Sequence, residues 1–142
     1  METNVTLRDD ISELQKRMLQ GEQVAVRFDG VVNGGMCART IYIEKGTRLV
    51  GGVHLTDHLN ICCGDITIFS EESGETRYSG YHVIPSNAGT KRVGIAHTNT
   101  IWTTILNVGD LTNMDEIMGT KTAPDFDDPR VLALNKLKEI GE

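Results

Sequence analysis

Residues 42–102 decide the fold of this chain, and they read YIEKGTRLVGGVHLTDHLNICCGDITIFSEESGETRYSGYHVIPSNAGTKRVGIAHTNTIW. Short runs rich in β-branched and aromatic residues alternate in this stretch with turns made of glycine, asparagine and serine. No run in it has the length and the period of an amphipathic helix. Many short strands at this spacing are typical of an antiparallel β-sandwich or β-barrel rather than of a parallel sheet.

The same pattern continues on both sides of this stretch, so we expect one mainly β core. The predicted strands are 24–28, 36–43, 47–55, 59–62, 66–70, 76–79, 82–85, 91–97 and 100–108. Glycine-containing turns separate them, among them Cys63-Gly64-Asp65, Glu72-Ser73-Gly74 and Asn87-Ala88-Gly89.

An amphipathic helix is predicted at the N-terminal end. Thr6 can cap this helix, and Gly21 can end it. Its apolar stripe consists of Leu7, Ile11, Leu14 and Met18, which recur at helical spacing. Such a stripe has to be buried, either against the sheet or against a second subunit.

Two short helices are predicted at the C-terminal end. The first follows Thr112 as its cap and is closed by Gly119. The last has Asp128 as its cap and Pro129 as its first residue. Its apolar face consists of Val131, Leu134 and Leu137. This helix is too short to be stable alone, so we expect it to dock on the barrel or on a neighbouring protomer.

The length of 142 residues suits one structural domain. We expect an N-terminal helix in residues 1–22, a β-barrel in residues 23–110 and a helical extension in residues 111–142. The chain shows no internal repeat and no low-complexity tract.

Composition and charge exclude several classes of function. The 14 basic and 20 acidic residues give a net charge of −6, and the basic residues do not cluster, so binding to a nucleic acid polymer is not expected. The N-terminus lacks the basic and apolar regions of a secretory signal, and no apolar run is long enough to cross a membrane. We therefore expect a cytoplasmic protein with reduced thiols at Cys37, Cys62 and Cys63.

A candidate site lies in the middle of the quoted stretch. Residues two apart on a strand face the same way, so His54, Thr56, His58 and Asn60 would share one face. On a straight strand the two histidines would lie about 13 Å apart, which is too far for both to bind one metal ion. A bend near Thr56-Asp57 would bring the two rings together.

The spacing of these residues resembles the first motif of the cupin superfamily. Gly46 opens the motif, His54 takes the place of its second histidine, His58 stands where the family has a glutamate, and Gly64 lies at the closing turn. Gly52 occupies the position of the first histidine. The match is therefore partial.

The second cupin motif is also only partly matched. Gly80 is similar to its opening glycine, and Pro85 and Gly89 are similar to its proline-to-glycine turn. Arg92 stands where the family has its histidine ligand.

A more specific resemblance is to small cupin-like proteins encoded by bacteriophages. The matching residues are Gly46-Thr47, Gly51, His54, Thr56, His58, Asn60-Ile61, Gly89 to Arg92, Ala96-His97, Thr100 and Trp102 to Thr104. This resemblance implies a mainly β, cupin-like antiparallel β-barrel or jelly roll with helices at its ends. It also implies a phage or prophage origin, but no particular reaction.

Two chemistries remain open at the candidate site. Cupin enzymes hold a divalent metal, so His54, His58 and His97 could bind Zn, Fe, Mn or Ni. Alternatively, Arg92 points inward, and with His54, Thr56, His58 and Asn60 it binds a small anion such as a phosphate or a carboxylate. On a regular strand Arg92 and His97 face opposite ways, so only one of them can point inward.

We interpret the chain as a binding protein more than as an enzyme. The favoured ligand is a small anion, with a nucleotide or a nucleotide-derived signal as one candidate, held in the cytoplasm of an infected bacterium. A metal-dependent dioxygenase, isomerase or hydrolase is the first alternative, and a virion component or host-interaction protein is the second. A homo-oligomer, a dimer or larger, is expected in each case.

Overall fold

The computed structural model describes residues 2–20 and 26–141, and it describes side chains in 8–20 and 26–137. The helices are α1 (Glu2–Gln20), α2 (Met114–Lys121) and α3 (Pro129–Gly141). The strands are β1 (Arg27–Asn33), β2 (Met36–Ile43), β3 (Arg48–Val50), β4 (Val53–His54), β5 (His58–Ser70), β6 (Gly74–Ser86), β7 (Val93–Ala96), β8 (Thr100–Asn107) and β9 (Thr122–Ala123).

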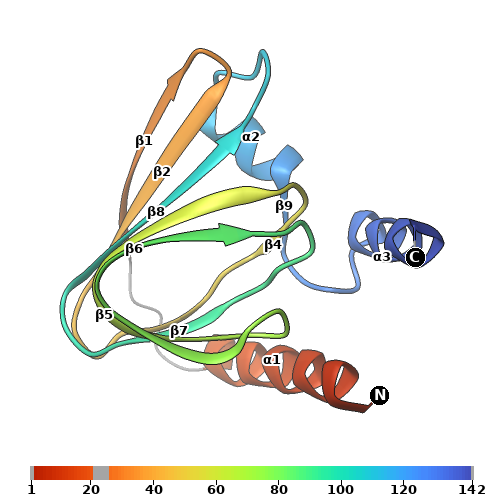
Figure 1. Cartoon of the computed structure of the whole chain (residues 1–142), viewed down its shortest axis with the longest axis horizontal. Coiled ribbons are helices and arrows are strands. Elements are labelled where there is room, and N and C mark those ends of the chain that lie inside the picture. The colour runs from red at the N-terminus through yellow and green to blue at the C-terminus, as the bar shows by residue number, and fades with distance from the viewer. Residues whose placement is uncertain (1, 21–25, 142) are drawn as a thin grey trace.

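One curled antiparallel sheet forms the body of the molecule (Figure 1). Its strand order is β1-β2-β8-β5-β7-β3, and β6 pairs with the other edge of β5. Every pairing in the sheet is antiparallel, as predicted. The curl leaves a half-barrel whose open side is partly closed by α2 and by the short pair β4-β9 (Figure 1). The prediction of a mainly β barrel with helices at the chain ends is confirmed.

The curl depends on a bend in β5 at Gly64. Residues 59–63 of β5 pair with β8, whereas residues 66–69 pair with β7. Gly64 has φ 147°, and a Cβ at this position would lie 2.7 Å from the Cα of Thr100. Only glycine fits this conformation and this close approach, so β5 can turn from one half of the sheet to the other without ending.

Two of the predicted breaks between strands are therefore wrong. The runs 59–62 and 66–70 are one strand, β5, and the runs 76–79 and 82–85 are one strand, β6, which pairs with β5 over its whole length. Glycines within the two strands look like turns in the sequence, but the long cross-strand pairing keeps the ladder intact around them.

The predicted strand 47–55 is wrong in the opposite sense, because it divides into β3 and β4. The break falls at Gly51-Gly52. A Cβ on Gly52 would lie 2.9 Å from the carbonyl oxygen of Ala123. The chain leaves the large sheet here to pair with β9 instead.

The helices occupy the predicted regions with shifted ends. Thr6 lies inside α1 rather than at its start, because nothing before it breaks a helix. Gly21, the predicted end of α1, and the first residues of the predicted strand at 24 lie outside the described residues. Asn113, not Thr112, caps α2 by accepting a hydrogen bond from the N–H of Glu116.

The last helix begins as predicted. Asp128 Oδ1 accepts a hydrogen bond from the N–H of Arg130, which caps the first turn, and Pro129 is the first residue of α3. Of the predicted apolar face, Val131 is fully buried, whereas Leu137 is exposed. Among the described helices none is long and apolar enough to cross a membrane.

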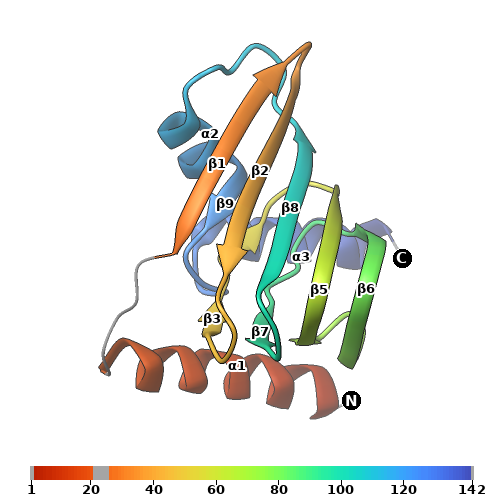
Figure 2. The same ribbon diagram turned by 90° about the vertical axis from the view of Figure 1, so that its left-hand side faces the viewer.

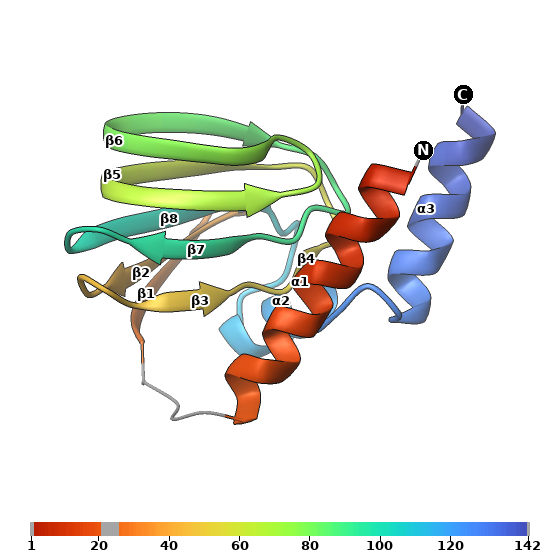
Figure 3. The same ribbon diagram turned by 90° about the horizontal axis from the view of Figure 1, so that it is seen from below.

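Two apolar clusters matter for the site. One joins α1 and α3 to the strand ends, through Ile11, Val53, Val93, Ala123, Phe126 and Val131. Figures 2 and 3 show α1 lying across the ends of the strands, with α3 beside it in the view from below. The other cluster lines the inner face of the curled sheet, through Ile43, Cys62, Ile66, Ile68, Ala96 and Trp102. This second cluster borders a cavity.

Candidate functional site

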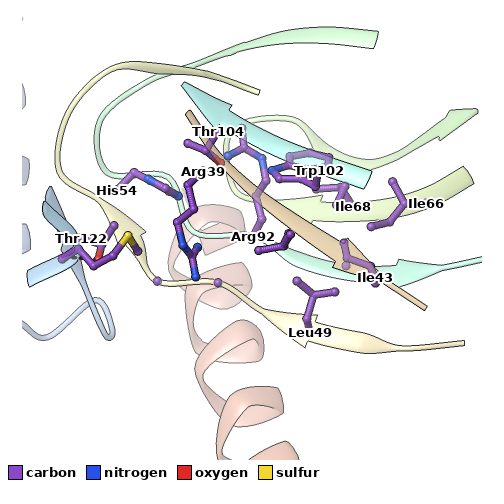
Figure 4. A pocket seen from close by; sticks show the side chains of 15 residues that line it. Arg39, Ile43, Leu49, His54, Ile66, Ile68, Arg92, Trp102, Thr104 and Thr122 are labelled. Carbon is purple, nitrogen blue, oxygen red and sulfur yellow. Dashed lines mark hydrogen bonds between the residues drawn. The ribbon is translucent and has the colours of Figure 1, made fainter. Parts of the chain in front are cut away.

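The cavity lies inside the curl of the sheet, where the resemblance places a barrel pocket. Its volume, counted for the centres of water-sized molecules, is about 100 Å³, which is enough for several waters or a small ligand. Strands β2, β3, β5 and β8 supply apolar walls, and α2 and β9 close one side. The polar side chains on the cavity are Arg39, His54, Arg92, Thr104 and Thr122 (Figure 4).

Arg39 reaches the cavity from the middle of β2. Its neighbours two residues away on the same strand face, Cys37 and Ile41, are apolar, so the guanidinium stands on an otherwise apolar face. It lies over the ring of Phe28, 5.0 Å from the ring centroid, and its Nε is buried without a hydrogen-bond partner. Burial lowers the pKa of Arg39 from its ordinary value, although arginine stays charged near neutral pH.

Arg92 enters the cavity from the residue before β7. Its Nη2 donates a hydrogen bond to Ser86 Oγ, and its guanidinium lies 5.9 Å from the centre of the Trp102 ring. Burial lowers the pKa of Arg92, and Glu72 partly offsets that effect from a distance. The carboxylate of Glu72 accepts hydrogen bonds from Asn87 and Thr90 instead.

Neither guanidinium has an acidic partner in the described part of the chain. The ion pairs there are Arg8–Glu71, Arg27–Asp29, Arg77–Asp65 and Arg130–Asp128, all away from the cavity. Arg39 and Arg92 are both partly buried, and a charge withdrawn from water without a counter-ion is costly, so two on one cavity mark a place where an anion would be stabilised.

His54 and His58 lie together, as the predicted bend at Thr56-Asp57 requires. Their rings stack with centroids 4.1 Å apart. His58 Nδ1 lies 2.9 Å from the carbonyl oxygen of Thr56, and because a carbonyl only accepts, this nitrogen carries the proton. His58 Nε2 is then an unprotonated acceptor, buried and without a hydrogen-bond partner.

Of these two rings, only His54 borders the cavity. Burial, followed by the charges of His58, Arg92 and Arg39, lowers the pKa of His54 to about 3. The imidazole is therefore neutral at neutral pH. It can donate or accept one hydrogen bond at the cavity without adding a third positive charge.

Asn60 supports the cavity wall rather than lining it. Its side chain is fully buried, and its Oδ1 accepts hydrogen bonds from Trp102 Nε1 at 3.1 Å and Thr104 Oγ1 at 2.9 Å. Its Nδ2 donates to Ser86 Oγ at 2.9 Å, the same oxygen that accepts from Arg92. The network Trp102/Thr104–Asn60–Ser86–Arg92 holds the guanidinium in place.

The other predicted site residues are placed differently. Thr56 contributes its carbonyl to His58 and is not a cavity residue. His97 lies outside the cavity, where its Nε2 is 2.7 Å from Thr67 Oγ1. The structure therefore brings Arg92, but not His97, to the cavity with His54.

The residues present do not fit the metal that the fold family would imply. Among the described residues, no group of three or more His, Cys, Asp or Glu side chains is placed to hold a metal ion. Two guanidinium groups beside His54 would also repel a divalent cation. Of the three histidine positions in the cupin motifs, only one is matched here, by His54, and the other two are Gly52 and Arg92, which offer no ligand.

The low pKa of His54 predicts how folding stability depends on pH. The unfolded chain protonates this imidazole below about pH 6.5, whereas the folded chain does not until about pH 3, so stability is lost as pH falls through this window. Between pH 7.5 and pH 5 the free energy of unfolding should fall by about 2 kcal/mol from His54. The lowered pKa of His58 acts in the same direction.

Urea unfolding of the wild type and His54→Gln at both pH values measures this effect. His54→Gln should reduce the difference in unfolding free energy between the two pH values by about 2 kcal/mol. His82→Gln, which changes an exposed ring on β6, should leave that difference unchanged. An equal pH dependence in wild type and His54→Gln would contradict the prediction.

Comparison with known proteins shows the fold. No protein-family model matches the sequence, and no curated protein sequence is similar to it. A cupin 2 conserved barrel domain protein from Leptotrichia buccalis superimposes with a TM-score of 0.52 at 16% identity. The match covers 72% of this chain and 50% of that protein. The present chain thus spans half the length of that protein.

Two further solved structures have the same architecture. A cupin superfamily protein from Desulfitobacterium hafniense gives a TM-score of 0.50 at 11% identity, covering 62% of this chain and 82% of its own. An uncharacterized conserved protein with a double-stranded beta-helix domain from Klebsiella pneumoniae gives a TM-score of 0.52 at 9% identity. The match covers 65% of this chain and 84% of that protein. The prediction of a cupin-like fold is confirmed.

Proposed function

We propose that this cupin-fold protein binds a small anionic molecule between Arg39 and Arg92. The observation that carries the proposal is the pair of partly buried arginines on one cavity, neither of them ion-paired within the described residues. Their planar donors suit a carboxylate or a phosphate, and an anion would offset the cost of withdrawing both charges in part from water.

The rest of the cavity favours binding over catalysis. The described residues that line it include no Cys, Ser, Asp or Glu, and His54 is the only imidazole among them. With a pKa of about 3, His54 is a weak base. Its neutral ring can instead hydrogen-bond to an oxygen of the bound anion.

A finer version of the proposal places the protein in a phage-infected bacterium. The resemblance of residues 46–104 to small phage-encoded proteins supports this origin and a cytoplasmic setting. If the ligand is a nucleotide or a nucleotide-derived signal, its phosphate would lie between Arg39 and Arg92. The aliphatic walls offer few hydrogen bonds to a base or a ribose, so the anionic group would carry most of the recognition.

Isothermal titration of the purified chain tests the proposal. We expect saturable binding of at least one of inorganic phosphate, AMP and short-chain carboxylates at millimolar concentration or below. Choline and ethylammonium, which are small cations, should not bind. Failure of every anion to bind at millimolar concentration would refute the proposal.

A further inference from the structure

We infer that the ligand is amphiphilic, a carboxylate with a short aliphatic tail, an inference that rests on the proposed anion site. The cavity is divided into a polar end and an apolar end. In Figure 4, Arg39, His54 and Thr122 lie toward one end, and Leu49, Ile43, Ile66 and Ile68 lie toward the other. Arg92 lies between them beside Trp102.

The polar end can bind one small head group. Arg39 and Arg92 supply the charge, and the neutral ring of His54 supplies one further hydrogen bond. The hydroxyls of Thr104 and Thr122 already donate, to Asn60 Oδ1 and to the carbonyl of Met118. A hydroxyl whose proton is already donated can accept but not donate, so these groups suit a water or a ligand donor better than a second anionic group.

The apolar end offers no hydrogen bonds to a polar ligand. Ile43, Ile66 and Ile68 are 2%, 0% and 4% exposed, so their side chains form a closed aliphatic wall. Gly94 lies on the same wall, where an added Cβ would meet the Cδ1 atoms of Ile66 and Ile68 at 3.2 Å. A polar ligand filling this end would lose its hydrogen bonds to water without replacement, whereas an alkyl group gains from leaving water.

A homologous series of carboxylates tests this inference. Acetate, butyrate, hexanoate and octanoate should bind with affinity rising about 4-fold per added methylene until the apolar end is full, and then level off. Inorganic phosphate and butyl phosphate, titrated in parallel, compare the two possible head groups with and without a tail.

Leu49→Ala tests the tail contact separately from the head group. Leu49 is only partly buried, so its truncation should leave the fold intact, which the thermal midpoint verifies. The variant should weaken hexanoate binding about 5-fold or more and leave acetate binding unchanged, whereas Leu132→Ala, on an exposed face of α3, should change neither.

The outcomes separate this inference from the proposed function. If acetate or phosphate binds as tightly as hexanoate, the apolar end plays no part and the tail inference is overturned while the anion site stands. If butyl phosphate binds and no carboxylate does, the inference that the ligand's head group is a carboxylate is overturned. If no anion binds at all, the proposed function fails and the tail inference fails with it.

A second, independent observation concerns the outer face of the curled sheet. Several large apolar side chains are exposed there, namely Val31, Met36, Leu59, Tyr81, Val83 and Ile101. Four of them, Leu59, Tyr81, Val83 and Ile101, lie in rows set by the pairing registers. The rows are Tyr42–Ile101–Cys63–Tyr81, Thr40–Thr103–Ile61–Val83, and Ala38–Ile105–Leu59–Pro85. These three rows across β2, β8, β5 and β6 contain no charged side chain.

We propose that this outer face binds a second copy of the same chain. With strands ~4.8 Å apart and same-face residues ~6.8 Å apart, three rows across the five strands from β1 to β6 cover roughly 490 Å² per copy. Two such faces bury about 1,000 Å², which is at the lower end for a specific interface. Where these rows continue onto the edge strand β1, their charged members, Arg27 and Asp29, pair with each other, so two such faces related by a two-fold axis can meet with these charges at the rim.

This assignment replaces the terminal helices as the expected oligomer contact. Ile11 of α1 and Val131 of α3 are already buried against the strand ends of their own chain. The leucines that remain exposed on the helices, Leu19, Leu132 and Leu137, do not extend the sheet face.

Sedimentation equilibrium at micromolar concentration tests the second proposal. The wild type should have twice the 15.6 kDa mass of one chain, and the double variant Val83→Glu/Ile101→Glu should have the single-chain mass with an unchanged circular dichroism spectrum. Leu132→Glu, an equally exposed site on α3, should remain dimeric. A monomeric wild type, or dissociation by Leu132→Glu but not by the double variant, would overturn it.

Discussion

Replacing Asn60 with alanine should lower the free energy of unfolding by about 3–5 kcal/mol. The side chain is fully buried and makes three hydrogen bonds, with Ser86 Oγ, Trp102 Nε1 and Thr104 Oγ1. Truncation leaves the indole N–H and one hydroxyl donor buried without an acceptor, and it also leaves a cavity. Each unsatisfied group costs about 1–3 kcal/mol.

Urea unfolding followed by Trp102 fluorescence measures this loss. Asn33→Ala, an exposed asparagine at the end of β1, is the matched control and should change stability by less than about 0.5 kcal/mol. A loss below about 1 kcal/mol in Asn60→Ala would show that water replaces the amide, and the wall behind Arg92 would then be less rigid than the hydrogen bonds suggest.

The Arg39→Met and Arg92→Met substitutions should each weaken anion binding by about 30-fold to 300-fold, or 2–3.4 kcal/mol. Each removes one charged donor group from the cavity while keeping an unbranched side chain. Because neither guanidinium has an acidic partner in the described residues, each substitution should also leave the free protein as stable as the wild type or more stable.

The opposite signs of the two effects make this prediction specific. A purely structural arginine would lose stability when replaced, and a purely solvated one would change nothing. Titration with the best-binding anion and thermal unfolding of the same samples give both quantities. Arg77→Met, which breaks the exposed ion pair with Asp65, is the control and should leave anion binding unchanged.

Arg92→Lys separates charge from geometry. Lysine keeps the positive charge but lacks the planar fork that donates to Ser86 and to a bound carboxylate together. We expect it to recover only part of the lost affinity. Equal affinity in the lysine variant and the wild type would mean that the site recognises charge alone.

The sequence predicted the strand-rich core well and the strand ends less well. Period-two runs and their turns indicate antiparallel β-structure, because they depend only on local residues. Whether a glycine ends a strand or bends it depends on the strands beside it. Gly64 and Gly80 both have positive φ, yet both lie inside continuous ladders, because β5 and β6 pair along their whole length.

The choice between Arg92 and His97 could not be made from the strand pattern. Alternation of faces applies only within a strand, and β7 spans only Val93–Ala96. Arg92 precedes β7 and His97 follows it, so the loops rather than the pleat set their directions. The bend between His54 and His58, by contrast, was predictable because two adjacent polar residues interrupt the apolar run.

Arg39 was missed, although the sequence carries a signal for it. In the run MCARTIYI, Cys37, Arg39, Ile41 and Ile43 share one face of the strand. A single cation among apolar residues on the face that turns toward the core is unusual unless it has a partner or a ligand. The residues that resemble the cupin-like proteins lie within 46–104, and Arg39 lies outside that range.

The close approach at Gly64 has a consequence for sequence variation. An added Cβ there would also lie 2.5 Å from Thr100 Oγ1, and that hydroxyl lies 3.2 Å from the Asp65 N–H, to which it is hydrogen-bonded. The Cα of Thr100 lies just as close, so no smaller side chain at position 100 would make room for a side chain at position 64. Chains that share this bend should therefore keep the glycine, whereas position 100 can vary among residues that still accept a hydrogen bond from the amide of residue 65.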